Sequence, residues 1–325
     1  MVNHHPDSAD VRNTFEDLSG VNIAAYANPY DALIQSSQND PTAFPPPQLI
    51  VSSKAKIQDF YGTHRTTRNE QQRAKLLSPD FSGLILDPSS KSSQTPPLSL
   101  AFKTPDIVSS HIRSLVDKVQ QELLALAPNL WLMPINNLHL TALEITHSLT
   151  SPEIHSILRA LGPPTIEAMT DYPYSHRARL IKPMISYDGA ALALSFLPAA
   201  GETLPAGERT KEDDAFTYHH LRRDLFNLAK STGVSVDSRY VVPSSHITLG
   251  RFLTQADHDS PEKMREWIKK IEDLNQWLKD EWWPKEGGKR DDTKEWVVGM
   301  EKGLDCRQGT LWYGDGETVR LGKGF

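Results

Sequence analysis

The amino-acid sequence predicts an α+β fold with largely antiparallel sheets and flanking helices, arranged as two related lobes. Helical stripes of apolar residues alternate along the chain with short segments of strand periodicity. Several of these segments are joined by tight turns, which favour antiparallel pairing. The order of a helix, a strand with a His-x-Thr triplet, a helix and further strands also occurs twice. We therefore expect two lobes of similar structure.

The first 97 residues divide into two segments of different composition. Residues 1–55 mix Asn, Asp, Ser and Pro and end in successive prolines, so we expect a flexible or surface-wrapping arm with little regular structure. Residues 56–97 begin with a basic helix, expected over 57–77, and end in a loop rich in Ser and Pro. This helix either covers the cleft as a lid or packs on the rear of one lobe.

The first strands and helix of the main domain follow residue 97. Residues 98–102 have strand periodicity, and Thr104-Pro105-Asp106 is a typical helix start whose apolar stripe continues to Pro128. Residues 130–133 and 138–145 are the next expected strands. We therefore expect a strand, a helix and two further strands before residue 150.

A second helix and a hairpin complete the first half. The helix begins at Ser151-Pro152-Glu153 and is expected to stop at Gly162, which precedes two prolines. Residues 177–187 and 191–199 have strand periodicity around Asp188-Gly189, a favourable hairpin turn. These two segments are therefore expected to pair antiparallel.

The second half repeats this order after a polar loop over 199–214. Its expected elements are a helix over 214–231, strands at 240–242 and 245–253, a helix over 260–282, and strands at 296–304 and 310–314. We therefore expect a bilobal domain over residues 98–325. One lobe is centred on residues 139–141 and the other on residues 246–248.

Composition restricts the classes of protein to consider. The chain has 325 residues, 38% hydrophobic and 23% charged, which excludes fibrous and wholly disordered classes. No apolar run approaches the roughly 20 residues that cross a bilayer, and the polar start does not suit a secretory leader. A formal charge of −6 argues against a surface that coats duplex DNA. We expect a monomer in the cytoplasm or nucleus, without membrane or duplex DNA as a partner.

Several kinds of active site lack their motifs in this chain. The single cysteine, Cys306, excludes an intrachain disulfide and a zinc site with several thiolates. The sequence contains no G-x-S-x-G elbow, no H-E-x-x-H helix and no Walker loop. We therefore expect neither a metal nor a cofactor.

The two predicted strands with a His-x-Thr triplet are the strongest functional signal. His139 and Thr141 lie on one side of the first strand, and His246 and Thr248 on one side of the second, because side chains alternate along a strand. Two other H-x-[ST] triplets have polar middle residues and no strand pattern. Either strand triplet alone is compatible with a structural histidine. Their equivalent positions in two similar halves favour a shared site.

Two imidazoles and two hydroxyls suit the chemistry of a phosphodiester. Hydrolysis needs one group that takes a proton from water and another that gives a proton to the leaving oxygen. The unperturbed pKa of histidine, about 6.5, allows one copy to be neutral and the other cationic. Hydroxyls donate to the non-bridging phosphate oxygens. The residues do not indicate which histidine is the base.

The motifs resemble those of the 2H phosphoesterases, which include RNA ligase-like cyclic phosphodiesterases. The strings NLWLMPINNLHLTALEITHS and SRYVVPSSHITLGRF are similar to fungal members described as RNA ligase/cyclic nucleotide phosphodiesterase. The resemblance covers about residues 98–325. It implies a bilobal, pseudo-two-fold fold that acts without metal on 2′,3′-cyclic nucleotides or RNA ends with a cyclic phosphate. It also implies His139 and His246 as the acid–base pair and Thr141 and Thr248 as phosphate-binding hydroxyls.

Weaker candidates are three aromatic and two cationic residues. Tyr240, Tyr218 and Trp131 could stack on a nucleobase, although aromatic residues at such spacings are often core residues. Arg177 and Arg179 alternate on one strand face and either neutralise a second phosphate or form plain salt bridges.

One arginine is expected to point away from the site. Arg251 alternates onto the apolar backing with Ile247 and Leu249, so we do not expect it among the binding residues.

Two other classes of function remain open at this point. A nucleotide-binding module would keep the cleft and bind phosphate through the histidines without turnover. A two-histidine isomerase or cyclase would act on a small metabolite without phosphorus. The pocket lining discriminates between them, because cations near both threonines favour phosphate and an apolar lining favours an uncharged substrate.

Overall fold

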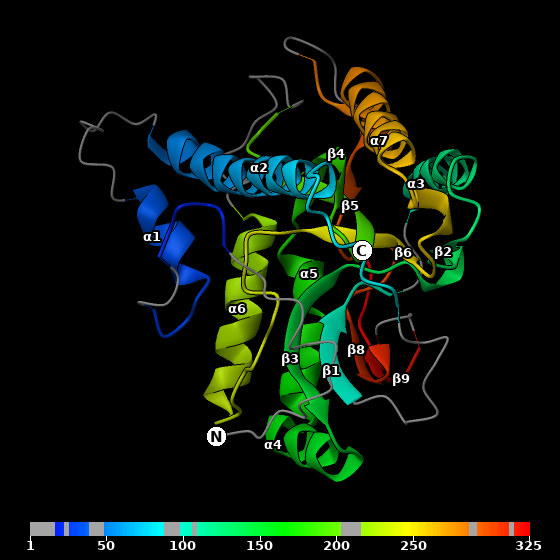
Figure 1. The fold of residues 1–325 in the computed structure, drawn as a ribbon. Coiled ribbons are helices and arrows are strands. Elements are labelled where there is room, and N and C mark those ends of the chain that lie inside the picture. Colours follow the sequence, from blue (N-terminus) through cyan, green and yellow to red (C-terminus); the bar gives the residue numbers. More distant parts are fainter. Residues whose placement is uncertain are drawn as a thin grey trace.

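Two antiparallel sheets lie at the centre of the molecule (Figure 1). The four-stranded sheet has the order β3-β1-β8-β9, with bounds Thr141–Leu149, Leu98–Lys103, Asp305–Gly309 and Glu317–Leu321. The five-stranded sheet has the order β2-β6-β5-β4-β7, with bounds Leu130–Leu132, His246–Phe252, Ala191–Pro198, Arg179–Tyr187 and Trp296–Val297. Every pairing within them is antiparallel. The predicted α+β class with antiparallel sheets and flanking helices is thus confirmed.

The computed structural model describes residues 17–22, 26–38, 49–87, 98–105, 109–202, 216–285, 291–311 and 315–325. The described α-helices are α1 (Asp31–Gln38), α2 (Leu49–Leu76), α3 (Ser110–Leu124), α4 (Ser151–Thr170), α5 (Tyr172–Ser175), α6 (Tyr218–Ser231) and α7 (Pro261–Trp282). The loop expected over 88–97 lies outside the described residues, as does most of the loop expected over 199–214.

The helices cover each sheet in a different way. Figure 1 shows α2 and α7 on either side of β4 and β5, and both helices contact these strands or their neighbours. Helices α4 and α6 pack against the four-stranded sheet through β1 and β3. Each of these helices turns an apolar stripe toward a sheet. On α7, for example, Trp267, Ile271 and Leu278 are fully buried. The remaining surface of the two sheets is therefore where a pocket can form.

Several expected elements differ in the structure. Residues 240–242 are irregular, and β7 is limited to Trp296–Val297. The last strand is β9, whereas the expected strand at 310–314 lies partly outside the described residues. The helix expected to stop at Gly162 resumes after a kink, because that glycine has a φ of 71° and Pro163 then starts a new helical turn.

Some of the described residues of the expected arm have regular structure. Helix α1 lies within that arm, Tyr30 is fully buried, and α2 packs over β4 and β5. The guanidinium of Arg65 on α2 donates to the carbonyl of Lys182 at 2.7 Å. The side chains of α2 are not among the described residues that line the pocket. Helix α2 therefore covers part of one face of the five-stranded sheet.

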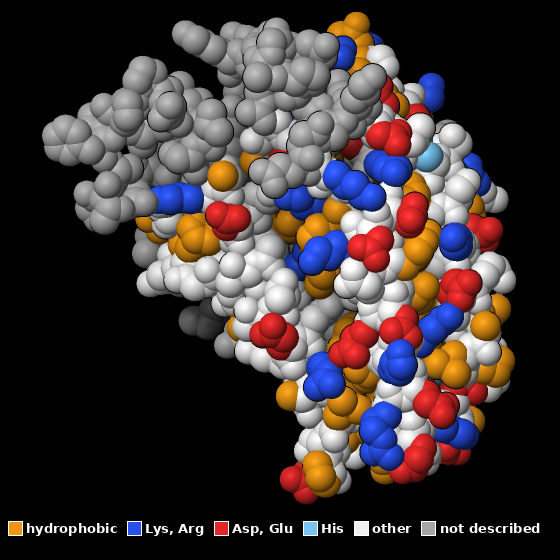
Figure 2. All heavy atoms as spheres, turned by 90° about the horizontal axis from the view of Figure 1, so that it is seen from above, with side chains coloured by type: hydrophobic (Ala, Val, Ile, Leu, Met, Phe, Trp, Pro, Cys, Tyr) orange, Lys and Arg blue, Asp and Glu red, His pale blue; other side chains and the backbone are white. Residues whose placement is uncertain are grey.

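Charges are mixed on the face that Figure 2 shows, where Lys and Arg side chains are interspersed with Asp and Glu. The exposed side of α7 has the same character, with ion pairs such as Lys269–Asp273 at 2.6 Å and Lys263–Asp259 at 2.8 Å. Exposed pairs of this kind stabilise a protein little.

Candidate functional site

The two His-x-Thr motifs meet where the two sheets touch. An isolated antiparallel bridge joins Leu140 to Ile247, the middle residues of the two motifs. Antiparallel geometry then sets His139 opposite Thr248 and Thr141 opposite His246. Leu140 and Ile247 are fully buried. The flanking histidines and threonines consequently share the opposite, accessible side of the junction.

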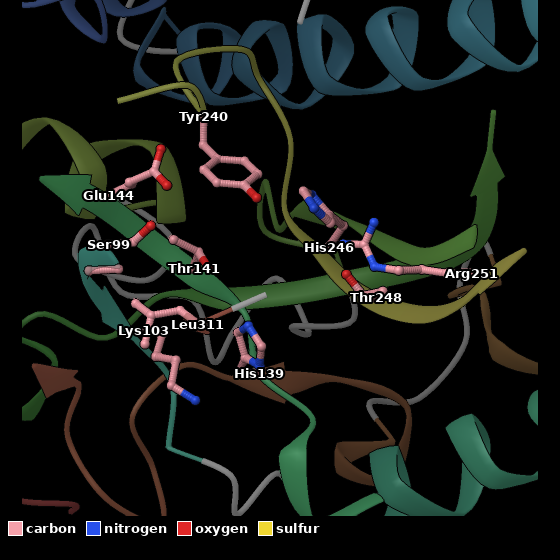
Figure 3. A pocket seen from close by; sticks show the side chains of 11 residues that line it. Ser99, Lys103, His139, Thr141, Glu144, Tyr240, His246, Thr248, Arg251 and Leu311 are labelled. Atoms are coloured by element: carbon pink, nitrogen blue, oxygen red, sulfur yellow. The ribbon is translucent and has the colours of Figure 1, made fainter. Parts of the chain in front are cut away.

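A pocket opens on that side of the junction (Figure 3). Its lining residues are Ser99, Ala101, Lys103, His139, Thr141, Glu144, Tyr240, His246, Thr248, Arg251 and Leu311. The hollow is small and open, with about 40 Å³ of space for the centres of water molecules. Figure 3 shows the two imidazoles diagonally opposite each other, with the threonines at the other corners. In a regular antiparallel pair such diagonal positions are about 7–8 Å apart, a span that suits one small anion.

Both motif strands contain one extra residue directly after the threonine. In β3 the register passes from Thr141 to Leu143 while β1 advances by one residue, and in β6 it passes from Thr248 to Gly250 while β5 advances by one. Such a bulge reverses the alternation of the following side chains. Glu144 and Arg251, each three residues after the motif threonine, therefore face the pocket.

The expectation for Arg251 was wrong, and sequence reasoning also missed Glu144, Lys103 and Ser99. Gly250 is a signal for the bulge at Arg251, because a glycine inside a strand often marks a bulge or a close approach. A Cβ atom on Gly250 would lie 2.6 Å from the carbonyl oxygen of Trp131 on β2. The bulge after Thr141 has no comparable signal in the sequence.

The ring of His139 is held in one orientation. Its Nδ1 lies 2.8 Å from the carbonyl oxygen of Asn137. Since a carbonyl only accepts, Nδ1 carries a proton and donates it. The Thr104 hydroxyl accepts from the amide of Leu140 at 2.9 Å and so fixes the backbone beside this histidine. In neutral His139, Nε2 is therefore the nitrogen that carries the lone pair.

His246 has a strongly perturbed environment. Burial lowers the pKa of its imidazole to about 4, and the positive charges of Arg68 and Arg222 act in the same direction. Its Nδ1 is 2.9 Å from the hydroxyl of Ser244. At neutral pH the ring is therefore uncharged, and one of its two nitrogens has a lone pair that can take up a proton.

Tyr240 is fixed above the pocket beside His246, with ring centroids 5.9 Å apart. The preceding residue, Arg239, forms an ion pair with buried Glu144 on β3 at 2.5 Å, and its backbone amide also donates to that carboxylate. The hydroxyl of Tyr30 donates to the carbonyl of Tyr240 at 3.3 Å. Two separate parts of the chain thus hold the backbone that bears this ring.

A buried arginine joins the two motif segments from behind. Arg222 on α6 donates to the carbonyl of Ala142 on β3 at 3.2 Å and to that of Val242 at 2.8 Å. It also donates to the Tyr30 hydroxyl at 3.2 Å, and its guanidinium lies 4.5 Å from that ring. Arg222 consequently ties the strand of Thr141 to the loop that leads into His246.

Four candidates from the sequence do not line the pocket. Tyr218 is fully buried, and its hydroxyl donates to the carbonyl of Thr141 at 2.9 Å, so it supports the site from behind. Trp131 lies opposite Arg251 across β2 and β6 but packs against the core. The guanidinium of Arg177 lies over Phe325, and Arg179 is paired with Glu295 at 2.5 Å. Their expected ligand contacts are therefore not part of this pocket.

The chain is thus a mixed α+β protein whose two antiparallel sheets meet at a pocket lined by two histidines and two threonines. No protein-family model and no curated protein matches it. Within the described residues, no group of three or more His, Cys, Asp or Glu side chains is placed to hold a metal ion. Nor do those residues include a helix with the length and apolar character needed to span a membrane.

Proposed function

We propose that this protein is a phosphodiesterase that hydrolyses 2′,3′-cyclic nucleotides or cyclic phosphate ends of RNA. The proposal includes the bilobal 2H phosphoesterase fold. The observation that carries it is the Leu140–Ile247 bridge, which brings both His-x-Thr motifs to one pocket. His139, His246, Thr141 and Thr248 then surround one phosphate.

The charge of the lining favours phosphate over an uncharged metabolite. Lys103 is the cross-strand neighbour of Thr141, and Arg251 follows Thr248 by three residues on the same side. Each threonine therefore has a cation nearby, and cations with hydroxyl donors suit the non-bridging phosphate oxygens. An isomerase or cyclase for an uncharged metabolite would not require these cations.

The environment of His246 supports a division of roles between the two histidines. His246 is neutral at neutral pH and takes a proton from the attacking water, while His139, when protonated, gives one to the departing ribose oxygen. The new bond joins the water oxygen to phosphorus, and the phosphorus–ribose oxygen bond breaks. The diagonal placement of the imidazoles suits attack and departure on opposite sides of phosphorus. Tyr240 offers its face to a nucleobase.

The test is turnover of a panel of nucleoside 2′,3′-cyclic phosphates, an RNA with a cyclic phosphate end, and linear diesters, all in excess EDTA. Hydrolysis of a cyclic phosphate to a monoester is expected, because the protein side chains supply the acid, the base and the donors. Calorimetry in which diesters bind but are never consumed would indicate the nucleotide-binding module instead. If no diester binds or reacts, the proposal is wrong.

The pH dependence of the reaction provides a second prediction. A general base must be neutral, and the pKa of His246 near 4 means that it becomes protonated only in acid. The acid limb of kcat/KM, which reports the free protein, is therefore expected near pH 4 instead of 6.5. A bound anion raises this pKa, so the acid limb of kcat is expected at higher pH. If the acid limbs of kcat and of kcat/KM both lay at pH 6.5, His246 would not be the general base.

A further inference from the structure

Three buried carboxylates line the pocket or lie next to its cations, although its proposed ligand is an anion. Glu144, Asp87 and Asp305 are each at most 9% exposed. A site built for a highly charged anion would be expected to keep carboxylates away, because each one opposes the ligand charge at short range. Their positions relative to the cations of the pocket explain their presence.

Each of these carboxylates lies beside a cation, and two of those cations, Lys103 and Arg251, line the pocket. Asp87 lies 3.7 Å from Nε of Arg251, and Glu144 is paired with Arg239. Asp305 is next to Lys103 in one cross-strand row, and it also accepts from Arg307 and Thr318. The positive charge offered to a ligand is therefore reduced by acidic groups of the protein itself.

The proposed reaction changes the charge of the ligand. A phosphodiester carries one negative charge. The monoester formed from it has a second ionisation with a pKa of about 6 and is mostly a dianion at pH 7.5. A pocket with partly balanced charge holds the monoanion well and gains little from the second charge of the product.

We propose that Asp87, acting through Arg251, makes the site select monoanionic phosphodiesters over dianionic phosphomonoesters, and thereby favours release of the product. This inference rests on the proposed function. Asp87 is a positioning and charge-balancing residue, because Arg251 and not Asp87 lines the pocket. Its backbone amide donates to the carbonyl of Phe252 at 2.9 Å, so the segment stays in place when the side chain changes.

The experiment compares two ligands that differ by one methyl group. Adenosine 3′-monophosphate and its 3′-methyl diester are titrated into the full chain by calorimetry at pH 7.5 and pH 5. The variants are Asp87→Asn and, as a second variant, Asp305→Asn. The control is Glu122→Gln. Glu122 lies on helix α3, is paired with Lys270 of α7 and does not line the pocket, so this variant removes the same charge elsewhere.

Wild-type protein is expected to bind the diester more tightly than the monoester at pH 7.5. In Asp87→Asn the Kd of the monoester is expected to fall about tenfold, equivalent to about 1.4 kcal/mol, and that of the diester much less. At pH 5 both ligands are mainly monoanions, so Asp87→Asn should change the Kd of both by the same factor. The Asp305→Asn variant is expected to act in the same direction and Glu122→Gln to change neither Kd.

Two results would overturn the inference while leaving the proposed function intact. One is a wild type that binds the monoester at least as tightly as the diester at pH 7.5. The other is an equal change for both ligands in Asp87→Asn at that pH. If wild-type protein binds neither ligand at millimolar concentration, the inference fails, and turnover of the cyclic phosphate panel then decides the proposed function separately.

Discussion

Replacing either His139 or His246 by alanine is expected to lower kcat for a 2′,3′-cyclic phosphate by about 10²–10⁴-fold, the usual contribution of one positioned proton transfer. Both rings line an open pocket, so their removal leaves space that water can fill. The fold should therefore persist. The measurement is single-turnover or steady-state hydrolysis, together with circular dichroism and a thermal melt of each variant.

The matched control for these variants is His155→Ala. His155 is an exposed histidine of α4 and does not line the pocket, so its loss should change neither turnover nor the melt. The double variant of His139 and His246 should be little worse than either single variant, because residues that act as a unit are not additive. Undiminished turnover in both single variants would end the acid–base proposal.

Arg222→Met is expected to reduce the free energy of unfolding by about 3–5 kcal/mol, because it leaves two buried carbonyls without their donor at a cost of about 1–3 kcal/mol each. Arg222 is 1% exposed. Without it the buried carbonyls of Ala142 and Val242 lose their donor, and the rings of Tyr30 and Tyr218 lose a cation 4.5 Å and 5.8 Å away. Urea unfolding measures the difference.

The control for this substitution is Arg223→Met at the next position of the same helix. Arg223 is partly exposed and paired with Asp224 at 2.7 Å, so its replacement should cost about 1 kcal/mol or less. If Arg222→Met does not accumulate as folded protein, Arg222→Lys provides the measurement, because it keeps the charge and loses the forked geometry. An Arg222→Met variant within 1 kcal/mol of wild type would contradict this account.

The motif strands could be predicted because their signal is local. Alternation places His246 and Thr248 on one side of a strand whatever the rest of the chain does. The structure does bring these residues together with His139 and Thr141. Their encounter depends on the bridge between Leu140 and Ile247, which no local pattern encodes.

Glu144, Arg251 and Tyr218 show where sequence reasoning stops. The first two face the pocket because each strand gains a residue relative to its neighbour, and that extra residue is a property of the pairing. Tyr218 is an apolar-face residue of an amphipathic helix, so its aromatic ring was a poor guide to ligand stacking. Its contribution is a hydrogen bond to the backbone of Thr141.

The same limit applies to parts of the fold. Residues 240–242 have strand composition but form a loop, since the side chains of Tyr30 and Arg222 bind the carbonyls of this segment in place of a strand ladder. Gly162 and the prolines after it predicted a helix end, and the chain instead turns there and continues as helix. Tertiary contacts override local composition in both cases.

The shell of Arg222 has a practical implication for shortening this protein. Tyr30 and Tyr61 supply hydroxyls to it from sequence positions well before the first strand of either sheet. A truncation that starts at residue 98 would expose the guanidinium to water. It would also expose the apolar side chains of α6 that the removed residues cover. Cutting sites for a minimal version are therefore to be sought upstream of Asn28, whose side chain anchors that stretch to Asn227 and to the backbone of Arg223.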